Sequence, residues 1–215
     1  MKVVLIGDSS VGKSALVTRF VQNQLPVASK ATVGIAFFKQ IVVDPDTNEE
    51  YTLQIWDTAG QEKFQSVTTH HYRAADGALL VFDTTNEASF RNLDRWLNEL
   101  YENTEPSVVV TLVGSKVDLK NRVVTEERAR AYANQHGLLY AETSSLWDKR
   151  WTSGGRGAAT GVERVFLSLV QAISRQRRDM GHNPLRIDMS GFNRTGMNNR
   201  VQLGEDGHRS KGCEC

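Results

Sequence analysis

Apolar residues recur along the chain with two different periods, which predict strands that alternate with helices. Continuous apolar runs at residues 78–82 and 108–113 are typical of parallel strands buried on both faces. Apolar residues three and four positions apart, as at 90–100, indicate an amphipathic helix. Further strands are predicted at 2–6, at 35–43 and 51–56, which a turn at 44–48 joins, and at 138–142. Further helices are predicted at 15–21, after an N-cap at Thr125, and at 162–173. This order predicts an α/β fold with a doubly wound, mostly parallel, six-stranded sheet, whose ligands bind beyond the carboxyl ends of the strands.

The periodic pattern ends near residue 176 and divides the chain into two predicted regions. Residues 1–175 are expected to form the domain. In residues 176–215, Gly, Asn, Arg, Asp and Ser predominate and isolated apolar residues keep no period, which predicts a disordered tail. Inside the domain, residues 146–160 combine glycines with Trp147 and Trp151 and are predicted to form a loop inserted before the last helix.

Charge and cysteine content argue against several classes of protein. The 26 Lys and Arg residues nearly balance the 25 Asp and Glu residues, and a net charge of +1 gives no reason to expect a nucleic-acid partner. Both cysteines lie within the last three residues, so no disulfide framework is predicted inside the domain, which suits a reducing compartment. No apolar run approaches the ~20 residues that a membrane-spanning helix needs.

Residues 7–14, Gly-Asp-Ser-Ser-Val-Gly-Lys-Ser, match the phosphate-binding pattern G-x-x-x-x-G-K-[ST] at every fixed position. Between a strand and a helix, the glycines allow backbone N–H groups to point at phosphate oxygens, and the helix N-terminus adds positive potential. Lys13 is expected to reach the terminal phosphates and the Ser14 hydroxyl to bind Mg²⁺. The alternative is a glycine-rich turn that binds nothing. The predicted phosphate-binding residues of this loop are Ser10, Val11, Gly12, Lys13, Ser14 and Ala15.

A second group of candidate residues follows the strand that ends at Trp56. The Asp57 carboxylate is placed to hold the hydration shell of Mg²⁺, and Gly60 allows a backbone N–H to approach a γ-phosphate. Gln61 is then placed to orient an attacking water. The pattern D-x-x-G alone usually marks a turn, but together with the phosphate loop it predicts nucleotide hydrolysis.

Candidate base-binding residues follow the last two predicted strands. Asp118 ends the segment Gly-Ser-Lys-Val-Asp and can accept from two N–H donors on the edge of guanine that adenine does not present; the alternative is a solvated turn. The segment at 142–145, Glu-Thr-Ser-Ser, would supply a backbone N–H to the guanine O6. The predicted base-binding residues are Ser115, Lys116, Asp118, Ser144, Ser145 and Leu146.

The order and spacing of these motifs resemble the Rab family of small GTPases, within the Ras superfamily, over roughly residues 1–175. The end of the chain, Cys-Glu-Cys, matches the C-x-C terminus of Rab proteins. The resemblance implies a P-loop NTPase fold of the small G-domain type. It also implies a monomeric enzyme that hydrolyses GTP to GDP and phosphate, slowly without an activating protein. Further Rab-like stretches lie at 31–37, 56–62, 71–75, 80–85 and 92–100.

The same resemblance implies a molecular switch in vesicle trafficking, on the cytoplasmic face of an intracellular membrane and with a cytosolic pool. Mg²⁺ is the expected cofactor, held directly by Ser14 and Thr32 and through water by Asp57, and Thr32 and Gly60 contact the γ-phosphate. The apolar patch that effectors contact is expected at Phe37, Trp56 and His71. Expected partners are an exchange factor, a GTPase-activating protein, effectors, and a prenyl-protein chaperone or GDP-dissociation inhibitor.

Cys213 and Cys215 have two interpretations. Two thiols alone make a poor zinc site, and on this view the pair is incidental. As prenylation sites they would carry two lipids, which give stable membrane anchoring where one gives only marginal binding. The Rab-like domain upstream favours prenylation, and the polar tail would supply reach between domain and membrane.

The chain departs from the Rab pattern mainly around the predicted base site. Ser115 stands where the family usually has asparagine, and its hydroxyl is expected to donate one hydrogen bond without also bracing the phosphate loop. Leu146 replaces lysine, Ser145 replaces alanine, and Leu25 replaces an aromatic residue near guanine. Two lost contacts of about 1 kcal/mol each would weaken guanine binding roughly thirtyfold and speed GDP release. A tryptophan of the inserted loop could instead stack on guanine in place of the missing aromatic residue. The other interpretation is that this segment is a surface loop with no part in binding.

Two other functions compete with a GTPase switch. A membrane-tethered interaction module with weak or rapidly exchanging nucleotide and little hydrolysis is favoured by the base-site departures. The intact phosphate and Mg²⁺ residues argue against it. An ordinary P-loop ATPase or kinase is disfavoured by Asp118, which does not suit adenine.

Overall fold

The computed structural model describes residues 1–24, 34–58, 71–146 and 161–182, and in them six strands form one sheet in the order β2-β3-β1-β4-β5-β6. All neighbouring strands are parallel except β2 and β3, which form an antiparallel hairpin. The predicted doubly wound, mostly parallel, six-stranded sheet is therefore confirmed. The strands are β1 (Lys2–Ile6), β2 (Ile35–Val43), β3 (Glu50–Thr58), β4 (Gly77–Asp83), β5 (Val109–Ser115) and β6 (Leu139–Glu142).

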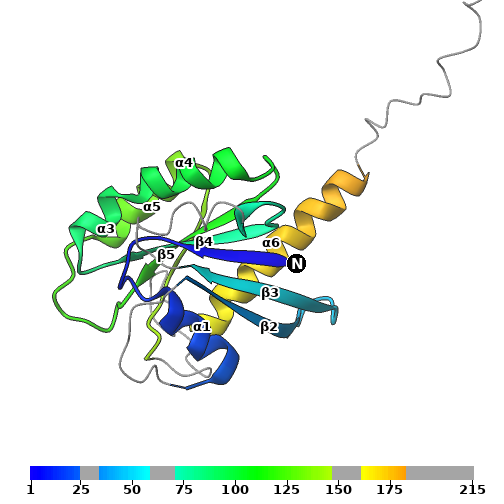
Figure 1. Ribbon diagram of the computed structural model, residues 1–215, viewed down its shortest axis with the longest axis horizontal. Coiled ribbons are helices and arrows are strands. Elements are labelled where there is room, and N and C mark those ends of the chain that lie inside the picture. Colours follow the sequence, from blue (N-terminus) through cyan, green and yellow to red (C-terminus); the bar gives the residue numbers. More distant parts are fainter. Residues whose placement is uncertain (25–33, 59–70, 147–160, 183–215) are drawn as a thin grey trace, which may run out of the picture. The chain divides into compact units, whose positions relative to one another are not determined.

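Helices cover both faces of this sheet (Figure 1). One apolar cluster joins the sheet to α4 and α5 through residues such as Trp96, Leu97 and Ala129. A second cluster joins the other face to α1 and α6, where the rings of Phe20 and Phe166 stack with centroids 4.0 Å apart. Because helices cover it on both sides, β4 is buried along its whole length, as its continuous apolar run predicts. The helices are α1 (Lys13–Gln22), α3 (Glu87–Arg91), α4 (Leu93–Asn103), α5 (Glu126–Gln135) and α6 (Val162–His182).

The ends of some helices could be predicted from local sequence signals and others could not. Thr125 caps α5 as predicted, since its side-chain oxygen accepts a hydrogen bond from Arg128 N at 3.3 Å. The helical pattern at 90–100, in contrast, belongs to two helices, because α3 ends and α4 begins at Asn92. The apolar period continues across this junction and therefore does not reveal it.

The last helix is longer than predicted. The apolar period supports a helix to residue 173 and a tail from 176, but α6 continues to His182. Its last turns carry polar contacts to the rest of the domain: Arg177 pairs with Asp76 at 2.5 Å, and Arg178 with Glu49 at 3.7 Å. Such contacts are invisible to hydrophobic periodicity. Met1–Arg178 form one compact unit, and of the residues beyond it only the end of α6 is described.

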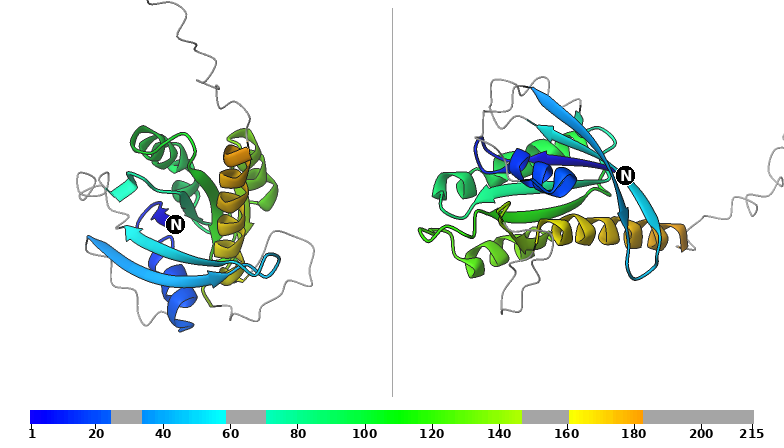
Figure 2. Two further views of the ribbon diagram at one scale, coloured as in Figure 1. Left: turned by 90° about the vertical axis from the view of Figure 1, so that its right-hand side faces the viewer. Right: turned by 90° about the horizontal axis from the view of Figure 1, so that it is seen from below.

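The tip of the β2–β3 hairpin lies beside the C-terminal half of α6 (Figure 2). Gln171 Nε2 donates to Asp44 at 2.8 Å and to Asp46 at 3.0 Å, within the turn predicted at 44–48. The hydroxyls of Tyr51 and Ser174 lie 2.8 Å apart. These bonds hold the hairpin at the edge of the sheet where β1 begins, opposite the edge where β1 ends.

Candidate functional site

The carboxyl end of β1 leads into the predicted phosphate loop, whose backbone requires glycine at two places. Gly7 has φ +135°, and a Cβ there would lie 2.2 Å from the carbonyl oxygen of Val81. Gly12 has φ +107° and immediately precedes α1. Both conformations lie in the region that favours glycine. The loop therefore has the strand–loop–helix arrangement that the sequence motif predicts.

Lys13 lies buried against this loop. Its Nζ donates to the carbonyl oxygens of Gly7 at 2.7 Å and Asp8 at 2.8 Å, and the residue is only 5% exposed. Burial lowers the pKa of Lys13 to about 8, although the negative charges of Asp57 and Asp8 act to raise it. A phosphate at the loop would supply the negative charge that favours the protonated form.

Asp57 and Ser14 form the candidate magnesium site. Asp57 is paired with Leu5 of β1 in the sheet and is 1% exposed. Burial raises the pKa of its carboxyl group, against a hydrogen bond from Ser14 and the charge of Lys13, which lower it. Among the described residues, no group hydrogen-bonds to Asp57 Oδ1. A buried carboxylate with a free oxygen beside a hydroxyl fits the hard oxygen ligands that Mg²⁺ prefers.

A second carboxylate, Asp8, fixes the phosphate loop to α4. Its Oδ1 accepts from Trp96 Nε1 and its Oδ2 from Asn92 Nδ2, both at 2.7 Å, and Arg95 lies 3.7 Å away. This clamp was missed from the sequence, because Trp96 belongs to the apolar helical stripe at 90–100. An indole N–H at the edge of such a stripe is the one signal that pointed to a polar partner.

Ser115 corrects an expectation about the base site. Its hydroxyl donates to the carbonyl oxygen of Val11, so serine does brace the phosphate loop. The contact is possible because β5 ends beside the loop: a Cβ on Gly12 would lie 3.6 Å from Ser115 Oγ. The carbonyl of Ser115 in turn accepts from the amide and hydroxyl of Thr84, at 3.1 and 3.0 Å. The residue is thus fixed from two sides and is 2% exposed.

The two predicted base-binding segments lie together. The Ser144 hydroxyl donates to Asp118 Oδ1 and accepts from the amide of Leu146 at 3.1 Å. Lys116 Nζ lies 2.7 Å from Asp83 Oδ2, at the end of β4. The carboxyl ends of β4, β5 and β6 therefore place these side chains on one edge of the sheet.

Arg19 of α1 also holds the base segment and was missed from the sequence. Its Nε donates to the carbonyl oxygen of Ser145 at 2.6 Å, and the residue is buried. The bond joins the helix that follows the phosphate loop to the loop after β6. An arginine among the apolar residues of a predicted buried helix is a signal that could have been followed.

The three side chains expected to form the effector patch are adjacent. The ring centroids of Phe37 and Trp56, paired across β2 and β3, lie 5.0 Å apart, and those of Trp56 and His71 lie 4.9 Å apart. Phe37 is 52% exposed. The remaining residues singled out from the sequence lie outside the described part of the chain: Leu25, Thr32, Gly60, Gln61, Trp147, Trp151, Cys213 and Cys215.

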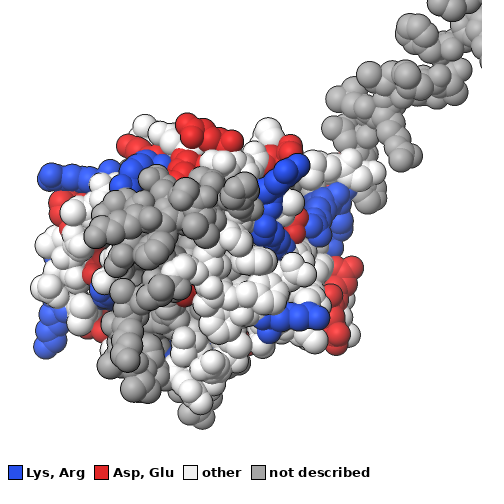
Figure 3. Space-filling view, in the orientation of Figure 1, with Lys and Arg blue, Asp and Glu red and all other residues white. Residues whose placement is uncertain are grey.

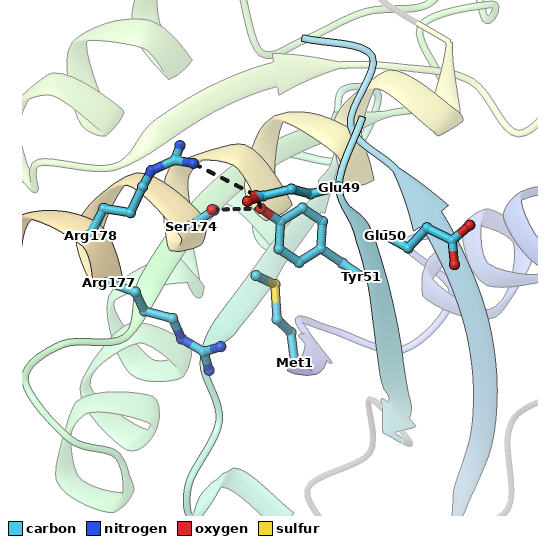
Figure 4. A pocket seen from close by; sticks show the side chains of 7 residues that line it. All are labelled: Met1, Glu49, Glu50, Tyr51, Ser174, Arg177 and Arg178. Carbon is cyan, nitrogen blue, oxygen red and sulfur yellow. Dashed lines mark hydrogen bonds and ion pairs between the residues drawn. The ribbon is translucent and has the colours of Figure 1, made fainter. Parts of the chain in front are cut away.

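A pocket of about 490 Å³ lies at the other end of β1, between the β2–β3 hairpin and α6 (Figure 4). Its two arginines are paired with carboxylates, Arg178 with Glu49 and Arg177 with Asp76, and the hydroxyls of Tyr51 and Ser174 contact each other. On the face drawn in Figure 3, positive and negative side chains of the described residues are interspersed. Neither feature competes with the strand-end site for a phosphate ligand.

Comparison with known proteins gives the family. A model of the Ras family matches residues 2–175. The chain belongs to the Ras family. It is 45% identical to Ras-related protein RABA1b of Arabidopsis thaliana over 176 residues, which cover 81% of this chain and 75% of that protein. It is 43% identical to the GTP-binding protein ypt3 of Schizosaccharomyces pombe over the same length, 76% of that protein.

These relatives confirm the resemblance to Rab-type proteins, and with it the small G-domain fold. As a Ras-family small GTPase, the chain is a hydrolase of GTP. Within the described residues, every helix is too short or too polar to cross a bilayer.

Proposed function

We propose that this chain is a Rab-type molecular switch that binds GTP and GDP with Mg²⁺ and regulates vesicle trafficking. The observation that carries the proposal is the buried pair of Lys13 and Asp57, with the half-buried Ser14, beside a phosphate loop braced by Ser115. The meeting of Asp118 with Ser144 supports a guanine site at the adjoining strand ends. The names of the curated relatives, Ras-related and GTP-binding, agree with both.

In the proposed reaction, water attacks the γ-phosphorus in line and GDP leaves. Lys13 would stabilise the charge that develops on the phosphate oxygens, and Gln61 would orient the water. Ser14, Thr32 and Asp57 would hold Mg²⁺, which when bound neutralises part of the developing charge. Because no arginine of the chain is assigned to the γ-phosphate, intrinsic hydrolysis is slow and depends on an activating protein.

The switch itself would involve the segments on either side of the β2–β3 hairpin. Thr32 and the Gly60 N–H would hold these segments against the γ-phosphate, and hydrolysis would release them. Effectors would contact the patch formed by Phe37, Trp56 and His71, whose rings already lie together. An exchange factor, an activating protein and a GDP-dissociation inhibitor complete the proposed cycle.

The experiment that tests hydrolysis compares two glutamine variants. Gln61→Leu should lower single-turnover GTP hydrolysis by at least about tenfold and abolish the 10³–10⁵-fold stimulation typical of an activating protein, with GTP binding retained. Gln54→Leu is the matched control, because Gln54 is an exposed residue of β3 and should leave both rates unchanged. Normal hydrolysis by Gln61→Leu, alone and with the activator, would contradict the proposed role.

A second candidate is a membrane-tethered interaction module with little hydrolysis. The base-site departures favour it, since Leu146 is 55% exposed and offers no charge. The retained Lys13 and Asp57 count against it, because burying two charges is costly unless a ligand uses them. Rapid release of GDP, together with little or no hydrolysis of GTP, would identify this alternative.

We further propose that Cys213 and Cys215 carry two prenyl groups and anchor the protein to the cytoplasmic face of an intracellular membrane. Their C-x-C spacing and the two-lipid requirement for stable anchoring support this. Mass spectrometry of the C-terminal peptide should find two lipids on the wild type and one on Cys215→Ser, with that variant largely in the cytosolic fraction. An unmodified peptide from the membrane fraction would rule out lipid anchoring.

A further inference from the structure

The Ser115 hydroxyl carries a single proton, and the structure shows which group receives it. A carbonyl oxygen can only accept, so Ser115 is the donor in its bond to Val11. The side chain can still accept a hydrogen bond, but it has no second proton to donate. Its position is fixed, because Thr84 holds its backbone and the residue is 2% exposed.

The next side-chain donor on this strand end is also engaged. Lys116, with φ +60°, directs its Nζ to within 2.7 Å of Asp83 Oδ2. Asp118, two residues further on, is an acceptor, and its Oδ1 is bonded by Ser144. The segment at the end of β5 therefore offers a base the acceptor Asp118. Its two side-chain donors, Ser115 and Lys116, are directed instead to the phosphate loop and to β4.

Guanine offers the acceptors N7 and O6 side by side, as well as N–H donors. Asp118 suits the donors, and a backbone N–H of residues 144–145 suits O6. We propose that this chain binds guanine without a hydrogen bond to N7, and that Ser115 is a positioning residue for the phosphate loop and not a base-reading one. The inference rests on the proposed guanine-nucleotide function of the same site.

The inference predicts how the protein treats 7-deaza-GDP, in which a C–H group replaces N7. Wild-type protein should bind GDP and 7-deaza-GDP equally well, within about twofold. Ser115→Asn should separate them, because a side-chain amide has two N–H donors, one for Val11 O and one for N7. GDP should then bind roughly two- to tenfold more tightly than 7-deaza-GDP, the range expected for one neutral hydrogen bond.

Two smaller changes at the same position separate bracing from base reading. Ser115→Ala removes the bond to Val11 and should lower the affinities for GDP and 7-deaza-GDP by the same factor, about fivefold. The ratio of the two affinities should therefore stay near one. Ser115→Thr is the conservative control, because it keeps one hydroxyl proton. It should restore the affinity that alanine loses, again with a ratio near one.

The experiment displaces a fluorescent GDP from the full chain with GDP or 7-deaza-GDP, in the presence of Mg²⁺, for the wild type and the three variants. A wild-type preference for GDP of more than about twofold would overturn the inference, because that is the effect of one hydrogen bond to N7. If Ser115→Asn binds nucleotide but its ratio of GDP to 7-deaza-GDP affinity equals that of the wild type, the inference is also overturned. If this variant does not fold, the same ratio in the wild type, Ser115→Ala and Ser115→Thr decides between the outcomes. Failure of the wild type to bind GDP at all would instead overturn the proposed function.

Discussion

Burial shifts the two ionisable side chains beside the phosphate loop in opposite directions. It lowers the pKa of the Lys13 ammonium to about 8 and raises the pKa of the Asp57 carboxyl group, so each is less readily charged than in water. A phosphate and a divalent cation are the ligands that would favour both charged forms at once. The pair therefore indicates a phosphate–metal site independently of the sequence motif.

Lys13 makes nucleotide affinity dependent on pH. In the nucleotide-free protein its pKa is about 8, against 10.5 for an unperturbed lysine. Between these values the unfolded chain binds more protons than the folded one, so the stability of the nucleotide-free protein rises with pH. Phosphate favours the charged ammonium, so GDP affinity should fall above pH 8, by up to about tenfold per pH unit.

Equilibrium binding of GDP from pH 7 to 9.5 measures this dependence. Lys13→Met should bind GDP weakly and without the slope. Lys2→Met is the control and should keep the wild-type slope, because Lys2 contacts Arg73 and Trp56 and not the phosphate loop. A wild-type affinity that stays constant from pH 8 to 9.5 would contradict a role for Lys13 in phosphate binding.

At the scale of residues, the sequence predicts the residue types of the candidate site better than it predicts the side-chain contacts that hold the phosphate loop in place. The phosphate motif correctly predicts a loop between β1 and a helix, which begins at Lys13, because the spacing of the motif has a local cause. The bond from Ser115 to Val11 was not predicted, because it depends on how close β5 ends to the loop after β1. The clamp of Asp8 by Trp96 was missed for the same reason: 88 residues separate the partners.

At the scale of elements, hydrophobic period predicts which strands and helices exist, and polar contacts determine where some of them end. All six strands lie close to their predicted ranges, and β1, β4 and β5 are short, largely apolar runs. The division of the segment at 90–100 and the extension of α6 to His182 follow from single residues and ion pairs that carry no period. The antiparallel hairpin was expected from its turn at 44–48.

One buried arginine–glutamate pair joins the loop after β5 to the end of β6, and a more exposed pair within α5 is its control. Arg122 forms two hydrogen bonds of 2.7 Å with Glu142, whose side chain is 3% exposed, and Arg130 lies 2.6 Å from Glu126, whose side chain is 30% exposed. Arg122→Gln should lower the free energy of unfolding by about 2–4 kcal/mol, because it leaves a buried carboxylate without its cation. Arg130→Gln should lower it by less than about 0.5 kcal/mol.

Urea denaturation of the nucleotide-free proteins measures both changes. Arg122→Gln should also weaken GDP binding, because Glu142 immediately precedes the segment that holds Ser144. Equal effects of the two substitutions on stability would show that burial of Glu142 does not govern the strength of the pair.

At the scale of the whole domain, the two edges of the sheet have different contents. The edge at the carboxyl ends of β1, β3, β5 and β6 gathers the charged and hydroxyl groups suited to a nucleotide. The opposite edge holds the tip of the β2–β3 hairpin against α6 through Gln171, Ser174 and Arg178. This polarity is what a doubly wound sheet predicts for its ligand site, and it follows from topology more than from any one residue.

The measurement that tests the central claim most directly is the release of a fluorescent GDP from the purified full chain, with Mg²⁺ present and with GTP or ATP as competitor. The account predicts slow release that quickens when the metal is chelated, with displacement by GTP and none by equal ATP. Displacement by ATP as effective as that by GTP, or no binding of GDP, would contradict a guanine-nucleotide switch.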